Sequence, residues 1–106
     1  MKTRDFLLLG YGAFDGRITG RTVLQKWIYF LSEMLDENHG FNPHYYGPYS
    51  AQVAEANSEL KALGYVDEDR TIYGWSHYGF EMARYDYSLT DDGYKILKRK
   101  QKGIPY

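Results

Sequence analysis

The apolar positions of residues 3–14 predict a first helix that is apolar around most of its circumference. A segment of this kind belongs in the centre of a core, and Thr3 is placed to cap its first turn. Gly10 and Gly12 weaken the last turns, because glycine is a poor helix former. The Asp-Gly pair at 15–16 predicts a turn directly afterwards. The apolar side chains of the segment are Phe6, Leu7, Leu8, Leu9, Tyr11 and Phe14.

Residues 17–20 are extended in character, and we expect a short strand that pairs with a later hairpin. A second helix is predicted over residues 21–36, with Thr19 or Thr22 as its cap and a stop before residue 40. Its apolar side chains recur at helical spacing, at Val23, Leu24, Trp27, Ile28, Leu31, Met34 and Leu35. Polar side chains fall largely elsewhere, at Arg21, Gln25, Tyr29, Ser32, Glu33 and Asp36.

The next segment, residues 37–48, is predicted to be a loop, and it is longer than the turn of a minimal helix-turn-helix. Ser50 is a good N-cap for a third helix over residues 51–63. Gly64 follows where a glycine commonly ends a helix. The residues expected on the inner face of this helix are Val53, Ala56, Asn57, Leu60 and Leu63.

After the third helix, the pattern changes to the alternation of strands. Residues 65–75 and 79–89 are predicted to pair as a hairpin, with a turn at 76–79. Thr90 then caps a last helix over residues 91–102. Its acidic first turn and basic remainder complement the helix dipole.

This order of elements predicts an α+β fold of the winged helix-turn-helix type. The order is helix, short strand, helix, helix, two-stranded wing and C-terminal helix, in a single domain that spans residues 1–106. The strand that enters directly from the third helix is the most specific part of the pattern. A small α+β domain of another topology is the alternative.

Composition narrows the function. The chain has 106 residues, a net charge of −1 and no cysteine. It therefore lacks a global positive field, and disulfides, thiolate catalysis and cysteine metal sites are excluded. No apolar run reaches the length of a membrane span, and the apolar run near the N-terminus is too short for a signal sequence. We expect a cytoplasmic protein with no membrane partner.

Enzyme chemistry finds little support. The histidines at 39, 44 and 77 lack the spacing of a zinc protease motif, and no nucleophile elbow is present. His39 and His44 lie near Asp36 and Glu37 and could hold a metal, but scattered polar residues in a loop after a helix are commoner. We expect no catalytic residue, no metal and no cofactor.

Two sets of motifs resemble known families. Residues 87–97, with Leu89-Thr90 and Gly93, resemble the end of the wing in many bacterial and archaeal winged-helix regulators. A second set of motifs covers most of the chain and consists of Gly20-Arg21-Thr22, Leu24-Gln25-Lys26, Tyr46-Gly47-Pro48-Tyr49-Ser50, Leu60 and Gly64-Tyr65-Val66. This set resembles the uncharacterised YwgA-type family, with a looser likeness to Panacea, or SocA-type, antitoxin domains. The resemblance implies a winged-helix fold. It does not imply a catalytic site.

The first functional hypothesis is a transcriptional regulator that binds double-stranded DNA. A helix start flanked by arginines can hold a phosphate. The outer face of the third helix argues against base readout, because Glu55 and Glu59 repel phosphates. Acidic residues also crowd the predicted wing. The DNA-binding candidates are Arg17, Arg21, Lys26, Gln52, Arg70, His77 and Arg84.

The second hypothesis is a non-catalytic protein-interaction module, antitoxin-like or involved in complex assembly. It would use the aromatic loop and the acidic third helix. The structural alternative for the loop is packing over Trp27 and the first helix. The protein-interaction candidates are His44, Tyr45, Tyr46, Tyr49, Glu55 and Glu59.

A homodimer is expected, because the last helix of many winged helices supports dimerisation. The apolar side chains of this helix and just beyond it could equally pack against their own core; they are Tyr94, Ile96, Leu97 and Ile104.

Overall fold

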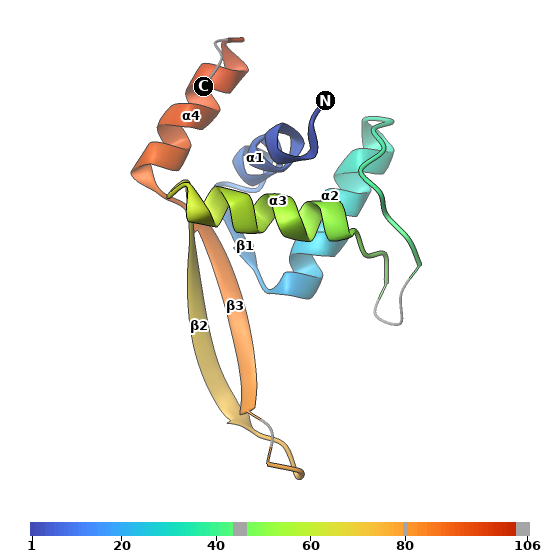
Figure 1. Cartoon of the computed structure of the whole chain (residues 1–106), viewed down its shortest axis with the longest axis vertical. Helices are drawn as coiled ribbons and strands as arrows, with labels where there is room; N and C mark the ends of the chain where they lie inside the picture. The colour runs from blue at the N-terminus through green and yellow to red at the C-terminus, as the bar shows by residue number, and fades with distance from the viewer. Residues whose placement is uncertain (44–46, 80, 104–106) are drawn as a thin grey trace.

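The structure is a computed structural model that describes residues 1–43, 47–79 and 81–103. Within these ranges it contains four helices and three strands, in the predicted order. The elements are α1 (Thr3–Ala13), β1 (Arg17–Thr19), α2 (Arg21–Met34), α3 (Ala51–Ala62), β2 (Val66–Trp75), β3 (Glu81–Leu89) and α4 (Asp91–Gln101). The helices form one body, and the β2–β3 hairpin projects far out of it (Figure 1).

The strands form one antiparallel sheet in the order β1-β3-β2. Ile18 on β1 and Glu68 on β2 both lie opposite Tyr87 on β3, so Tyr87 is central to the sheet. Ile18 and Tyr87 are buried, and they mark the face that turns toward the helices. Only the base of the hairpin has a third strand beside it, because β1 pairs with residues 86–88 alone.

Helix α1 lies at the centre of the core, as its apolar density predicts. Phe6, Leu7, Leu8 and Tyr11 are almost completely buried. Two of its glycines allow close packing. A Cβ atom at Gly12 would lie 2.7 Å from Leu97 Cδ2, so α4 approaches this helix closely.

Three of the predicted helix ends are confirmed. The Ser50 hydroxyl accepts a hydrogen bond from the Val53 backbone at 3.1 Å, and the Thr90 hydroxyl accepts one from the Gly93 backbone at 3.0 Å. Gly64 has a φ angle of 81° after the end of α3, a conformation that favours glycine. In each case the end is fixed by contacts a few residues apart.

Two predicted caps are wrong. Lys2 occupies the N-cap position of α1 without a side-chain cap, and the Thr3 hydroxyl instead lies 2.9 Å from Nδ1 of His39. At α2 the N-cap position belongs to Gly20, whose φ angle is 95°, so neither Thr19 nor Thr22 caps that helix. These hydroxyls therefore do not stabilise the helix starts.

The predicted inner face of α2 is partly wrong. Met34 and Leu35 are 80% and 59% exposed, because the helix ends there and no described element covers its last turn. Gln25 and Ser32 are buried instead, since both find backbone partners. Leu63, predicted on the inner face of α3, is half exposed as the C-cap residue of that helix.

The last helix packs on its own chain. Leu97 is buried and Ile96 packs against the core, whereas Tyr94 is 41% exposed. Ile104 lies outside the described residues. Among the described residues, no helix is both long enough and apolar enough to cross a membrane.

Candidate functional site

Two segments that are distant in sequence meet at Gln25 and Ser50. The Gln25 amide nitrogen donates to the Ser50 carbonyl at 3.0 Å, and the Ser50 backbone N–H donates to the Gln25 amide oxygen at 2.8 Å. The Ser50 hydroxyl also donates to the backbone carbonyl of His39. This buried cluster fixes the start of α3 against α2 and the preceding loop.

A groove lies beside this cluster, between the first turn of α2, the side of α3 and the base of the hairpin. Its volume is about 400 Å³. We call it the Arg21 groove. Its lining residues are Arg21, Thr22, Leu24, Gln25, Gly47, Pro48, Tyr49, Ala54, Asn57, Ser58, Lys61, Glu68 and Tyr87.

The hairpin holds Arg21 in place. Its Nε donates to the Tyr87 hydroxyl at 3.2 Å, and its guanidinium lies 3.7 Å from the centre of the Tyr85 ring. Burial raises the pKa of Tyr87, and Arg21 partly opposes that rise. The contacts with Tyr87 and Tyr85 hold the guanidinium in one position, although Arg21 remains exposed at the surface.

Beside Arg21, Lys61 donates to the carboxylate of Glu68 at 3.1 Å. Burial alone would raise the pKa of Glu68, but the hydrogen bond from Lys61 helps to bring it below its usual value. The two charges neutralise each other, so Arg21 supplies the net positive charge of the groove.

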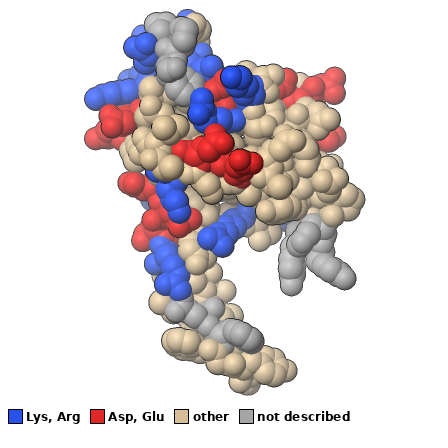
Figure 2. All heavy atoms as spheres, in the orientation of Figure 1, with Lys and Arg blue, Asp and Glu red and all other residues tan. Residues whose placement is uncertain are grey.

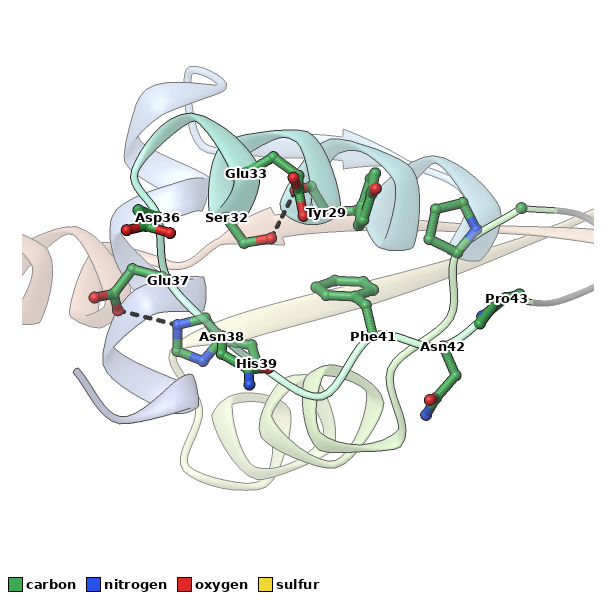
Figure 3. Close-up of a pocket in the computed structure, with 12 residues that line it drawn as sticks. Tyr29, Ser32, Glu33, Asp36, Glu37, Asn38, His39, Phe41, Asn42 and Pro43 are labelled. Carbon is green, nitrogen blue, oxygen red and sulfur yellow. Dashed lines mark hydrogen bonds and ion pairs between the residues drawn. The ribbon is translucent and has the colours of Figure 1, made fainter.

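A second hollow, of about 630 Å³, lies at the end of α2 and along the following loop (Figure 3). Three carboxylates line it, at Glu33, Asp36 and Glu37, together with the rings of Tyr29 and Phe41. The two rings meet edge to face, with their centres 5.4 Å apart. Because of these three carboxylates, the second hollow suits a cation better than an anion.

His39 borders the second hollow, but its ring is buried and both of its nitrogens contact other side chains of the protein. It is 2% exposed, its ring stacks on Phe6, and its Nε2 lies 3.2 Å from the Glu37 carboxylate. The hydrogen bond from His39 lowers the pKa of Glu37. His44 lies outside the described residues. Among the described residues, no three His, Cys, Asp or Glu side chains gather as a metal site requires.

The outer half of the hairpin is a third candidate, which the sequence analysis missed. Tyr73, Trp75 and Tyr78 are 65%, 66% and 87% exposed, and Ile72 and Met82 are also exposed. No Lys, Arg, Asp or Glu occurs between Arg70 and Glu81. Figure 2 shows the result: the far end of the hairpin carries neither charge colour. The sequence signal that could have revealed this surface is the absence of charged residues from the outer half of a hairpin that is otherwise rich in them.

The register of the sheet separates the DNA-binding candidates. Arg70 lies opposite Tyr85, so it shares the helix-facing side with Arg21. Arg17 lies opposite Ser88, and Arg84 lies two residues from Asp86 on that same side of β3, so both occupy the reverse face. Arg84 also forms an ion pair with Asp86 at 3.0 Å. The predicted set is therefore split between two faces.

The outer face of α3 is exposed as predicted. Gln52, Glu55, Ser58, Glu59 and Lys61 are all exposed. Arg4 lies 3.9 Å from Glu59, and Lys61 is paired with Glu68. Acidic and basic side chains mix across the face shown in Figure 2, without a continuous positive strip from α3 to the hairpin.

The remaining candidates are spread over the surface. Lys26 is exposed on α2, and His77 is exposed in the turn of the hairpin. Tyr49 is 43% exposed and pairs through its backbone with Asn42. Tyr45 and Tyr46 lie outside the described residues, so the predicted packing of that loop stays a prediction.

The described residues thus define a small mixed α+β domain with four helices and a three-stranded antiparallel sheet. Over 94 residues the chain is 36% identical to "Uncharacterized protein YwgA" of Bacillus subtilis (strain 168). The match covers 86% of this chain and 52% of the relative, so the chain spans about half the length of that protein. It supports the YwgA-type family over most of this chain.

No protein-family model matches the chain, and no solved structure matches it. The likeness to Panacea domains stays a prediction.

Proposed function

We propose that the chain is a non-catalytic protein-interaction module with a winged-helix fold, and that the outer half of its hairpin is the docking surface. The element order, with β1 on the far side of β3 from β2, supports the fold. One observation carries the function: three aromatic side chains are more than 60% exposed on a segment without Lys, Arg, Asp or Glu. Exposed apolar patches of this kind mark interaction sites.

The hairpin is also only weakly stabilised by the rest of its own chain. A two-stranded ribbon is only marginally stable in water, and β1 supports no more than its base. Apolar side chains exposed on the hairpin raise its free energy in water, and burial against a partner would remove that cost. A protein surface that covers the hairpin would therefore supply hydrogen-bond partners for its backbone edges and would bury its aromatic rings.

The partner that we propose is a second copy of this chain. An aromatic side chain carries about 150–250 Å² of surface, so Tyr73, Trp75 and Tyr78 together expose roughly 450 Å². Two such surfaces, together with Ile72 and Met82, reach the area of about 1,000 Å² that a specific interface needs. Helix α4 contributes less, because Leu97 is buried in its own chain.

Sedimentation velocity over a concentration series tests this assignment. We expect wild-type protein to self-associate and the double variant Trp75→Ser, Tyr78→Ser to remain monomeric. Met34→Ser is the matched control, because Met34 is an apolar residue that is 80% exposed on α2, away from the hairpin. Wild-type protein that stays monomeric throughout, or a control that dissociates as the double variant does, would reject self-docking.

DNA binding is the second candidate. Its specific support is the helix-facing side of the hairpin base, where Arg21, Lys61 and Arg70 lie together. Glu68 on the same side weakens the field, so the proposal rests mainly on Arg21. A fluorescence titration with mixed duplex DNA should show affinity that falls with salt and is reduced in Arg21→Ala. Affinity that is absent at low salt, or unchanged by this substitution, would exclude DNA binding.

A further inference from the structure

The Arg21 groove has the size and composition of a ligand site. Its volume of about 400 Å³ falls within the usual range of small-molecule pockets, about 300–1,000 Å³. Three elements line it, so a ligand there would contact α2, α3 and the hairpin at once. Two polar groups in its wall have hydrogen-bonding capacity that no described residue uses.

The first of these groups is the guanidinium of Arg21. Tyr87 accepts from its Nε, and its central carbon lies over the Tyr85 ring. Its two terminal nitrogens form no hydrogen bond with any described residue. A fixed guanidinium with both terminal nitrogens open is suited to a carboxylate, which it can bind through two parallel hydrogen bonds.

The second group is the side-chain amide of Asn57. Asn57 is 6% exposed and lines the groove, and its Oδ1 accepts the Tyr11 hydroxyl at 2.6 Å. Its Nδ2 donates to no described residue. This nitrogen is not sealed off from the groove, so the amide can donate a hydrogen bond to an occupant that offers an acceptor.

The rest of the groove defines the body of the ligand. Leu24, Pro48 and Ala54 contribute apolar wall. Lys61 and Glu68 neutralise each other, so a single positive charge remains at Arg21. We propose that the groove binds a small organic monoanion, with its carboxylate on Arg21, an acceptor atom on Asn57 and an apolar body between them. This site is separate from the hairpin surface and stands whether or not the chain self-associates.

Nuclear magnetic resonance titration of the full chain tests the proposal, with acetate, benzoate and salicylate as probes and salicylamide as the neutral control. We expect benzoate or salicylate to move the side-chain signals of Arg21 Nε–H and Asn57 Nδ2, and salicylamide to bind less well. Arg21→Gln should weaken binding by about tenfold or more, because it removes a charge-assisted contact. Lys26→Gln, which removes an exposed charge elsewhere on α2, should bind as wild type does.

Three results would overturn the assignment. The first is that none of the three anions shifts the Arg21 and Asn57 signals. The second is that Lys26→Gln weakens binding as much as Arg21→Gln, which would indicate a general charge effect. The third is that salicylamide binds as tightly as salicylate.

Discussion

Gln25 and Ser50 are joined by two hydrogen bonds, in which the side-chain amide of Gln25 pairs with both backbone groups of Ser50. Both residues are buried, at 7% and 0% exposure. The two residues belong to separate motifs, Leu24-Gln25-Lys26 and Gly47-Pro48-Tyr49-Ser50. Their pairing explains how a motif on α2 and a motif in the loop serve one structural purpose, which is to fix where α3 begins.

Replacing Gln25 with Leu should therefore destabilise the protein strongly. The substitution keeps an apolar volume on the helix but leaves the buried Ser50 backbone N–H unpaired, at a cost of about 1–3 kcal/mol, while the Ser50 carbonyl keeps its hydrogen bond from the Ala54 backbone. Chemical denaturation would measure the change in the free energy of unfolding. Lys26→Ala, at the exposed neighbouring position, is the control and should change it by less than about 0.5 kcal/mol. Equal effects of the two substitutions would show that the Gln25 pairing contributes little.

Gly93 provides a prediction about the junction between the hairpin and α4. A Cβ atom built there would collide with the backbone carbonyl oxygen of Tyr65, and the Thr90 backbone donates to that same carbonyl. Backbone atoms cannot move aside as a side chain can. Gly93→Ala should therefore lower the free energy of unfolding by about 1–3 kcal/mol in chemical denaturation.

Gly74 is the matched control for Gly93. It lies in β2, and no atom of the described residues lies within 4 Å of a Cβ built there. Gly74→Ala should leave the free energy of unfolding within about 0.5 kcal/mol of wild type. A neutral Gly93→Ala variant would mean that α4 can shift away from the Tyr65 carbonyl at little cost.

The Lys61–Glu68 pair predicts a pH dependence. The pKa of Glu68 is lowered in the folded protein, from its ordinary value of 4.5. A lowered folded pKa gives stability that is fully present above the unfolded value and is lost as pH falls through the folded value. Below about pH 4.5, stability should therefore fall, and Glu68→Gln should flatten this acid limb in denaturation curves.

Lys61→Gln tests the cause of that dependence. It removes the donor that lowers the pKa of Glu68, so it should flatten the acid limb in the same direction while the carboxylate remains. If the acid limb keeps its full slope in both variants, other carboxylates control acid unfolding.

Some of this architecture can be predicted from sequence because its causes are local. Ser50 and Thr90 bind backbone groups three residues ahead, and that spacing is visible in the chain. Strand alternation places Tyr85 and Tyr87 on one face for a similar reason. The order of the elements follows from such local patterns.

The rest depends on contacts between distant residues. Gln25 looks like a surface residue of an amphipathic helix until the loop that carries Ser50 comes to cover it. Thr3 has the chemistry of a cap, yet its hydroxyl lies against His39, 36 residues away. Arg17 and Arg21 are neighbours in sequence, but the sheet register and the start of α2 place them on different faces. None of these relationships leaves a periodic pattern in the chain.

The pair of Tyr11 and Asn57 gives the sharpest energetic prediction. Burial raises the pKa of the Tyr11 hydroxyl, and the proton that it keeps is donated to Asn57 Oδ1 at 2.6 Å. Tyr11→Phe should cost about 1–3 kcal/mol, because it leaves a buried acceptor unpaired. The double variant Tyr11→Phe, Asn57→Leu should recover part of that loss, since replacing both partners by apolar groups removes the unpaired acceptor. A double-mutant cycle measured by chemical denaturation gives the coupling energy, and additive effects of the two substitutions would show that the hydrogen bond contributes nothing of its own.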